Sequence, residues 1–240
     1  MGKTSIEWCT HSLNFVKWWC TKISPGCKNC YMMALAKRYP QHAADRPVWR
    51  DKAMKELRSL PPGAEVFVGD MYDIFHKDMP EDFIVEQILN APAIRPDVTL
   101  LYLTKRIDRA EEFLSKWVLR PNVWLGTSVE SRGYLWRIDA LKRIEAPGKY
   151  ISIEPQLENI GDVDLRGIDG VIVGGESGAN RRPFDKAWAR NIRDICQRDG
   201  VKFFFKQGSA FAPGQDRLLD GREWNDLAWR VEEPTQQGMF

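Results

Sequence analysis

Seven short apolar runs recur along the chain, and each ends in polar residues or glycine. They are rich in Val, Ile, Leu and Phe, and continuous apolar runs of this length are typical of parallel strands that are buried on both faces. The runs cover residues 5–8, 65–70, 99–106, 122–130, 150–155, 170–178 and 201–208. The pattern therefore predicts seven parallel strands.

Segments with the apolar spacing of an amphipathic helix lie between several of these runs. They cover residues 81–90, 108–117, 132–144 and 185–199. Asp185 can cap the last segment and Gly200 follows its end, while Asp108 can cap the second segment. Alternating strands and helices with right-handed crossovers predict a parallel α/β architecture.

The number of strands limits the architecture further. Seven strands are too few for a closed eight-stranded barrel, so a partial (β/α)6–7 barrel of the TIM type fits best. A doubly wound sheet is the alternative. We expect residues 1–208 to form the barrel, with a functional loop at 20–30, and residues 209–240 to form an irregular extension packed on it, because glycine and proline recur there.

Composition narrows the class of protein. The 240 residues are 43% hydrophobic and 28% charged, as in an ordinary globular domain. No apolar run reaches the length of a membrane span, and the chain does not open with a charged and then apolar leader, so we expect neither a membrane anchor nor secretion. Five cysteines, three of them clustered, favour metal binding in a reducing compartment, the cytoplasm, over a disulfide framework.

The clustered cysteines are Cys20, Cys27 and Cys30, in the run CTKISPGCKNCY. Three thiolates with a short final gap can bind three corners of an iron–sulfur cluster. Electron-transfer clusters usually have four protein ligands, and so do structural zinc sites. A cluster with one open corner would leave an iron free for a substrate or cofactor, so the motif points to chemistry.

Polar residues gather at the ends of the predicted strands, where α/β folds place their active sites. Each one taken singly is more simply a cap, a turn or a surface ion pair, but their repetition favours a shared site. The cysteine loop follows the first predicted strand and belongs to the same rim. The strand-end residues are Asp70, Asp73, His76, Lys105, Arg106, Thr127, Ser128, Glu130, Glu154, Gly174, Gly175, Glu176, Ser177, Lys206 and Gln207.

Charge is spread unevenly although the net charge is only +2. Residues 181–206 hold eight Lys and Arg against three Asp, and residues 37–58 hold seven against three acidic residues. Such stretches can neutralise phosphates, and they can equally form the solvated face of a helix. The chain also has ten Trp; most should be core, and exposed ones could stack on bases.

The cysteine triplet, the aromatic Tyr31 beside its last member and the partial barrel resemble the radical S-adenosylmethionine superfamily. The gaps of six and two residues depart from that superfamily's usual three and two. From about residue 3 to 229, the chain resembles a phage-associated three-cysteine-motif family, and it departs from that family's pattern at Cys9, at the segment before Cys20, at Gly69 and at Gly208. The motifs that carry this resemblance are SIEW, CTKISPGCKNCY, DIFH, LTKR, NVWLGTSVE, SIEP, VIVGGESG, FFFKQ and DGREW.

The resemblance implies a 4Fe–4S cluster on Cys20, Cys27 and Cys30, with S-adenosylmethionine chelated at the open iron. Reduction by a donor such as flavodoxin or ferredoxin would release a 5′-deoxyadenosyl radical that abstracts a hydrogen atom from the substrate. It also implies cofactor-binding residues: Asp70 for the methionine amino group, Ser128 and Glu154 for the carboxylate and ribose, and Tyr31, Gly174, Gly175 and Glu176 around the cofactor.

Further residues are candidates for the substrate or for catalysis. Cys9 is expected near the rim and is a candidate hydrogen-atom donor, whereas Cys196 is expected to be a packed small side chain. His76 is the best placed histidine, although a capping or core role is simpler. The other candidates are Asp73 and Gln207 and, for anionic substrate groups, Lys105, Arg106, Arg181, Arg182 and Lys206.

Three functions stay open. The leading one is a radical enzyme of phage DNA hypermodification in the host cytoplasm, with DNA as substrate; our specific hypothesis is an isomerase that moves a glycyl substituent on thymine from N-linked to C-linked. The second is radical chemistry on a peptide or small metabolite. The third is a non-enzymatic iron–sulfur or zinc module, in which Cys9 or His11 supplies a fourth ligand.

Overall fold

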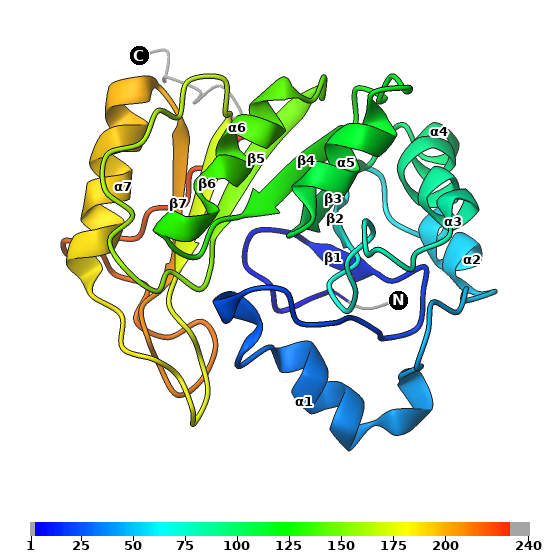
Figure 1. Ribbon diagram of the computed structural model, residues 1–240, viewed down its shortest axis with the longest axis horizontal. Helices are drawn as coiled ribbons and strands as arrows, with labels where there is room; N and C mark the ends of the chain where they lie inside the picture. Colours follow the sequence, from blue (N-terminus) through cyan, green and yellow to red (C-terminus); the bar gives the residue numbers. More distant parts are fainter. Residues whose placement is uncertain (1–2, 231–240) are drawn as a thin grey trace, which may run out of the picture.

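The centre of the protein is a seven-stranded, wholly parallel sheet that curls into a half-barrel (Figure 1). The computed structural model describes residues 3–230. The strands lie side by side in chain order, which excludes the doubly wound alternative, because that fold reverses its strand order. The strands are β1 (His11–Leu13), β2 (Glu65–Val68), β3 (Thr99–Thr104), β4 (Val123–Ser128), β5 (Gly148–Ile153), β6 (Gly170–Gly174) and β7 (Lys202–Gln207).

Helices cover the convex face of this sheet, while one helix, α1 (Tyr31–Arg38), stands apart beyond the strand ends (Figure 1). The covering helices are α2 (Ala53–Arg58), α3 (Glu81–Val85), α4 (Ala91–Ile94), α5 (Ile107–Leu114), α6 (Trp136–Arg143) and α7 (Lys186–Asp199). A π-helical turn, Glu86–Asn90, joins α3 to α4. Pro92 lies just beyond it and has no N–H for the regular helical bond, which suits an irregular turn there.

The predicted helix ends are confirmed at one helix and wrong at another. Asp185 caps α7 by accepting the Ala187 N–H, and Gly200 ends it in the left-handed conformation at φ 73°. The cap predicted at Asp108 is wrong, because Arg106 is the N-cap and α5 already begins at Ile107.

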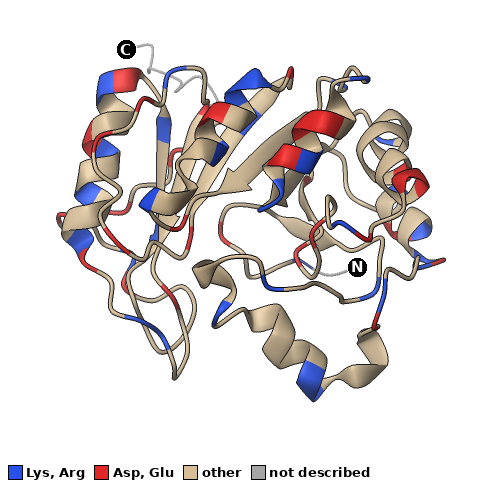
Figure 2. Ribbon diagram, viewed as in Figure 1, with Lys and Arg blue, Asp and Glu red and all other residues tan. Residues whose placement is uncertain are grey.

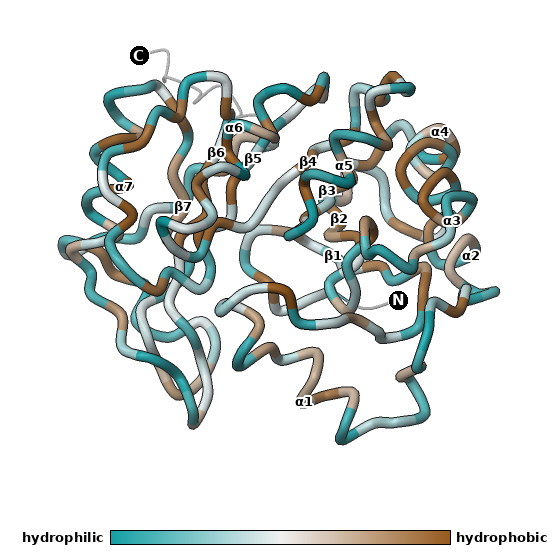
Figure 3. The backbone as a smooth tube through the Cα atoms, viewed as in Figure 1, coloured by the Kyte–Doolittle hydropathy of each residue, from teal (hydrophilic) through white to brown (hydrophobic). Residues whose placement is uncertain are grey.

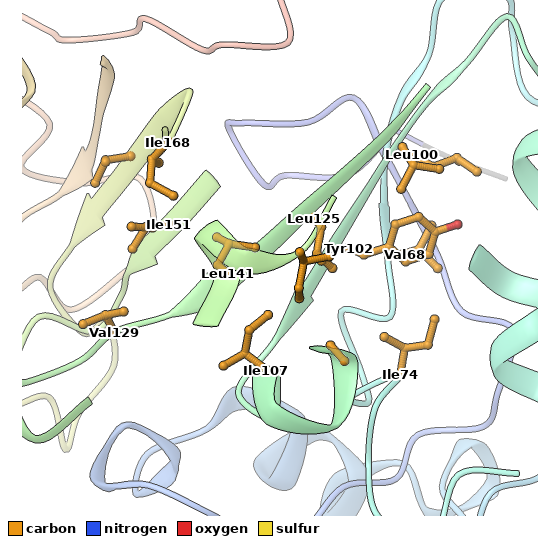
Figure 4. Packing of buried hydrophobic residues seen from close by; sticks show 14 of the residues in the cluster. Val68, Ile74, Leu100, Tyr102, Ile107, Leu125, Val129, Leu141, Ile151 and Ile168 are labelled. Atoms are coloured by element: carbon orange, nitrogen blue, oxygen red, sulfur yellow. The ribbon is translucent and has the colours of Figure 1, made fainter. Parts of the chain in front are cut away.

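Alternation along the strands divides the core into two parts. Residues of one parity face the helices, and Figure 4 shows Leu125 of the sheet near Leu141 of α6 and Ile107 of α5. Figure 3 shows the same division as apolar strands beneath helices with polar outer faces. Strand residues of the other parity point into the half-barrel and form a second cluster with residues from before β1 and after β7. The strand residues are Phe67, Leu101, Tyr150, Ile172 and Phe204, and the others are Trp8, Cys9, Leu227 and Trp229.

The first predicted strand is wrong. Residues 5–8 form a turn whose apolar side chains fill the half-barrel, and the first strand is His11–Leu13. Trp8 is only 3% exposed and packs on Phe67, with ring centroids 4.6 Å apart. The apolar run is therefore buried by packing inside the barrel and forms no strand pairing of its own. As a consequence, Cys9 precedes β1 and lies at its amino end.

The last described segment packs against β7. The Phe205 N–H donates to the Trp224 carbonyl at 2.9 Å, and the Asp226 N–H donates to the Phe203 carbonyl at 3.2 Å. Trp229 then enters the half-barrel. Of the predicted extension 209–240, residues 231–240 lie outside the described part of the chain. No helix within residues 3–230 combines the length and the apolar character needed to cross a membrane.

Candidate functional site

A cavity of about 290 Å³ lies at the carboxyl ends of the strands, beneath the cysteine loop. Its volume is near the lower end of the range for ligand pockets. Most of the residues that the sequence singles out line this cavity, so the prediction of one shared rim is confirmed. They are Cys20, Cys27, Cys30, Tyr31, Asp70, Asp73, Lys105, Arg106, Ser128, Glu154, Gly175, Glu176, Ser177, Lys206 and Gln207.

The cysteine loop runs from Cys20 to Cys30 and leads directly into α1. A short 3₁₀ turn, Pro25–Cys27, presents the second thiol, and Cys30 is the residue that precedes the first turn of α1. Cys27 is buried, and Cys20 and Cys30 are half-buried. All three thiols are free and border the same cavity.

Asp73 fixes the start of this loop. Its carboxylate accepts a hydrogen bond from Arg106 at 3.0 Å, and the same guanidinium donates to the carbonyl and the hydroxyl of Thr21, both at 3.1 Å. Thr21 Oγ1 is also 2.6 Å from Nε2 of the buried His76. Because Thr21 follows Cys20, this network sets the position of the first thiol.

Glu130 fixes the middle of the loop. This carboxylate is fully buried and accepts hydrogen bonds from the Ser24 hydroxyl at 2.5 Å and from Arg137 at 3.1 Å, while Lys105 lies 2.6 Å away. Burial raises the pKa of Glu130, but Lys105, Ser24 and Arg137 together lower it by more than burial raises it, so the net pKa lies below its ordinary value. The carboxylate therefore stays charged at neutral pH.

Gly26 allows the loop to approach Glu130 this closely. A Cβ at this position would lie 2.5 Å from Cγ of Glu130, which is closer than atoms can approach. Ser24 Oγ, which donates to Glu130, is in turn 3.7 Å from the Cys27 sulfur. The second thiol is thus positioned through Ser24 by a buried carboxylate.

Glu176 fixes the end of the loop. Its carboxylate pairs with the side chain of Arg182 and accepts the Arg182 backbone N–H at 2.7 Å. It also accepts a hydrogen bond from the Asn29 amide at 2.9 Å. Asn29 directly precedes Cys30, so a loop residue near each of the three cysteines is tied to a strand-end carboxylate. Ser24 and Asn29 are tied directly, and Thr21 is tied through Arg106.

These contacts change the role of several predicted residues. Asp73, Arg106, Lys105 and Glu176 border the cavity, but their charged groups are engaged in holding the loop. Gln207 is engaged as well, because its amide donates to the Gly175 carbonyl and accepts the Gly214 N–H. The partners that the sequence did not single out are the loop residues Thr21, Ser24 and Asn29 and the helix residue Arg137. Their only signal was that they are polar and close to a cysteine or a strand end.

A second set of polar groups faces the cavity and can form further hydrogen bonds with a ligand. Ser128 and Ser152 lie on β4 and β5, and within the described residues their hydroxyls have no hydrogen-bond partner. Ser152 was not predicted, although strand alternation places it on the same side as Glu154. Asp70 accepts a hydrogen bond from Asn14 at 2.6 Å, and burial raises the pKa of this carboxyl.

Lys206 and Glu154 form an ion pair across the cavity floor, with Nζ 2.5 Å from Oε1. Gly174 lies between them on the middle strand, and a Cβ there would be 3.5 Å from atoms of both residues. Burial lowers the pKa of Lys206, but the Glu154 carboxylate raises it more, so the amine keeps its proton. Tyr31 donates a 2.6 Å hydrogen bond to the Asp70 carbonyl at the other side of the cavity.

The predicted residues that do not border the cavity are Cys9, His76, Thr127, Glu130, Gly174, Arg181 and Arg182. Cys9 is 5% exposed in the cluster that fills the half-barrel, and burial raises its pKa to about 12, so the placement near the rim is wrong. His76 lies behind Thr21 and contacts its hydroxyl. Burial, and to a smaller extent the positive charge of Arg106, lowers the pKa of His76 to about 4. Arg181 is exposed on the loop after β6, where it donates to the Gly178 carbonyl. Cys196 is buried on α7, as predicted.

The thiols differ in how readily they lose their protons. Burial raises the pKa of Cys20 to about 11, although Arg106 acts in the opposite direction. Burial also raises the pKa of Cys27, but main-chain hydrogen bonds, the Ser24 hydroxyl and Lys105 lower it more, and the net pKa is below 9.0. Cys27 is therefore the more readily ionised of these two thiols.

Three free thiols around one cavity are the type of donor that holds an iron–sulfur cluster in proteins. Within residues 3–230, no three His, Cys, Asp or Glu side chains converge on a point that one metal ion could occupy. Thiols that share one zinc ion lie about 3.8 Å apart, because each Zn–S bond is about 2.3 Å and the geometry is tetrahedral. A 4Fe–4S cluster binds each thiolate through a different iron and does not require such convergence. Neither Cys9 nor His11, the fourth ligands considered for a module, borders the cavity.

Fold and site together define a half-barrel α/β protein with a three-thiol cavity at the carboxyl ends of its strands. A family model described as "Protein of unknown function (DUF5131)" matches residues 3–229, and the chain belongs to this family. No curated protein and no solved structure matches the chain.

Proposed function

We propose that the protein is a radical S-adenosylmethionine enzyme. The observation that carries this proposal is that three free thiols border one cavity. Polar side chains at the ends of strands β2 to β7 line the rest of the same cavity. A 4Fe–4S cluster with S-adenosylmethionine supplies a 5′-deoxyadenosyl radical on reduction. Cys20, Cys27 and Cys30 would hold the cluster.

The remaining cavity residues bind and orient the cofactor and the substrate. Asp70, fixed by Asn14 and beside Tyr31, can accept from an ammonium group. Ser128 and Ser152 can donate hydrogen bonds to a carboxylate or a ribose hydroxyl. Glu154 and Lys206 offer one negative and one positive group at the floor, where a polar ligand can replace one partner of their ion pair.

The substrate that we propose is a nucleobase in DNA, and the reaction is the isomerisation of a glycyl substituent on a thymine methyl group. A hydrogen atom leaves the glycyl Cα, the methylene carbon migrates from nitrogen to Cα, and a hydrogen atom returns to nitrogen. One C–N bond and one C–H bond break while one C–C bond and one N–H bond form, so the reaction needs no net oxidant. Support comes from Lys22 and Lys28 of the cysteine loop, which have no acidic partner within the described residues.

Mass spectrometry tests this isomerase. Nucleosides from DNA treated with the reconstituted protein should contain a species with a changed retention time and an unchanged mass. The matched control is a Cys27→Ala protein under identical conditions. DNA with the N-linked substituent that shows no shifted species would exclude the isomerisation while leaving other radical reactions for separate measurement.

A free small metabolite is the second candidate substrate. The cavity volume of about 290 Å³ favours it, because a cofactor already fills much of such a space. The two candidate substrates differ because a nucleobase in DNA requires the protein to bind a polymer, whereas a free metabolite does not. Failure of the protein to bind DNA at low salt would favour the metabolite.

A further inference from the structure

The long connection between β1 and β2 is far more basic than the rest of the chain. Residues 14–50, the first part of this connection, contain seven Lys and Arg and a single acidic residue, Asp45, a net charge of 7 − 1 = +6 in a chain with a total of +2. This connection carries the cysteine loop and α1, and Figure 2 shows its blue positions away from the helices that cover the sheet. The seven basic residues are Lys17, Lys22, Lys28, Lys37, Arg38, Arg46 and Arg50.

Most of these cations have no acidic partner. Within the described part of the chain, only Arg50 of the seven forms an ion pair, with Glu56 at 3.0 Å. The basic stretch 181–206 is different, because its side chains are engaged by Asp and Glu from the same or neighbouring elements. The paired residues there are Arg182, Lys186, Arg190, Arg193, Arg198 and Lys206.

The positive charge of the stretch 181–206 is therefore largely neutralised by acidic residues of the protein itself. Unpaired cations on one connection leave a positive surface that attracts anionic ligands. A solvated helix face would not explain this distribution, since α1 contributes only Lys37 and Arg38 and the other five cations lie on loops and extended segments.

A groove with an aromatic wall lies on this connection. It encloses about 350 Å³ between the edge strand β1 and the returning chain, and it is lined by Lys17, Trp18, Gln41, His42 and Arg50 among others. The rings of Trp18 and His42 lie in contact with centroids 5.0 Å apart and an angle of 41° between their planes. The acidic residue of the groove, Glu56, is already paired with Arg50.

The walls of the groove are held by the main chain. The Trp18 N–H donates to the His42 carbonyl at 3.1 Å, and the Lys17 N–H donates to the Val48 carbonyl at 2.9 Å. The Lys17 side chain is exposed and the Trp18 ring is half-buried, so both remain accessible to a ligand. Fixed aromatic rings beside free cations are the arrangement that binds single-stranded nucleic acid, through stacking on bases and neutralisation of phosphates.

We propose that this groove and the cations around it bind a single-stranded nucleic-acid segment that flanks the nucleotide held in the cavity. The proposal rests on the proposed function for the identity of the cavity's substrate, but binding at the groove is measurable without catalysis. Helix α1 links the two sites: Tyr31 at its start borders the cavity, and Arg38 at its end is followed three residues later by Gln41, which lines the groove. Its eight residues span about 12 Å, which is three to four nucleotides at about 3.4 Å each.

Such a surface gives the enzyme a preference for a polymer over a free nucleotide. Contacts to several phosphates add affinity that a single nucleotide cannot obtain, and they lower the affinity steeply as salt rises. Stacking on Trp18 or His42 requires an unpaired base and therefore favours a single strand or a distorted duplex.

Fluorescence anisotropy with a labelled single-stranded oligodeoxythymidylate tests the proposal on the full-length, anaerobically purified protein. The double variant Lys17→Gln/Arg38→Gln should reduce the slope of log affinity against log salt by about 1.4, since each lost phosphate contact accounts for about 0.7. The variant Trp18→Leu should weaken binding by about 5- to 100-fold. The matched control is Lys116→Gln/Arg120→Gln, which removes two exposed cations without ion pairs in the described structure, at the opposite rim.

The control should keep the wild-type slope and affinity. Equal slopes for both double variants together with wild-type affinity in Trp18→Leu would overturn the proposal. Stronger competition by polyglutamate than by unlabelled oligonucleotide would overturn it in favour of an acidic polypeptide. Groove-dependent binding by a protein that forms no 5′-deoxyadenosine would support the groove and count against the radical enzyme, so the two proposals fail separately.

Discussion

Replacing Gly26 by alanine tests whether the cysteine loop is seated on a buried carboxylate. A Cβ at Gly26 would lie 2.5 Å from both Cγ and Oε1 of Glu130 and 2.8 Å from Cδ. Non-bonded carbon atoms are comfortable at about 3.5–4.0 Å, so one of the two segments must move by about 1 Å. Glu130 is held by Lys105, Arg137 and Ser24, and the loop is therefore the part that should move.

The expected cost follows from this overlap. Adding a methyl group to a fully packed site costs about 1–3 kcal/mol, which corresponds to a fall in Tm of about 2–12 °C for a chain of this size. Movement of the loop also displaces Ser24 and the neighbouring Cys27 sulfur. Gly26→Ala should thus lower both the Tm of the metal-free protein and the iron retained after anaerobic reconstitution.

Gly133→Ala is the matched control, because nothing lies within 4 Å of a Cβ at Gly133. It should leave both quantities at the wild-type value. Differential scanning calorimetry gives Tm, and a colorimetric assay gives iron per chain. A Gly26→Ala protein that matches Gly133→Ala in both measurements would refute the seating of the loop on Glu130.

Three further predictions concern the charged groups around the cavity. Glu130→Gln leaves Arg137, 1% exposed, without its charge partner, so Tm should fall by about 6–20 °C, whereas Glu111→Gln at an exposed pair should change it far less; equal losses would contradict the buried network. Burial holds the pKa of His76 at about 4, below its ordinary 6.5, so protons bind the unfolded chain more tightly and favour it. As pH falls from 6.5 to 4, the free energy of unfolding measured in urea should fall by about 3 kcal/mol more in the wild type than in His76→Gln. Parallel pH profiles of the two proteins would argue against a neutral buried imidazole. Lys206→Met leaves Glu154 without its partner on the cavity floor, so S-adenosylmethionine affinity measured by equilibrium dialysis should change at least tenfold more than in Lys116→Met; no difference would remove the pair from the cofactor site.

The strands were predictable because each is buried on both faces and so forms a continuous apolar run. Six of the seven predicted strands overlap the observed ones. The first was misplaced, because β1 is a short edge strand with the sequence HSL and no apolar run, while the nearby apolar residues 5–8 pack inside the barrel. An apolar run records burial, and it does not record whether the buried segment pairs as a strand.

The position of the site at the carboxyl ends of the strands was predictable from the sequence, but the role of each residue there was not. Chain order alone places Asp73, Glu130 and Glu176 at strand ends, since every strand of a parallel sheet ends at the same edge. Which of them would hold the loop depends on contacts such as Glu130 with Ser24 and Glu176 with Asn29, which join residues more than 100 positions apart. No periodic pattern in the sequence records such pairs.

The most direct test of the proposed activity is the formation of 5′-deoxyadenosine. The protein is purified and reconstituted without oxygen, reduced with dithionite in the presence of S-adenosylmethionine, and the products are separated by chromatography. The account predicts 5′-deoxyadenosine from the wild type and none from Cys27→Ala. Wild-type protein with a complete cluster that forms no product, or equal product from Cys27→Ala, would contradict it.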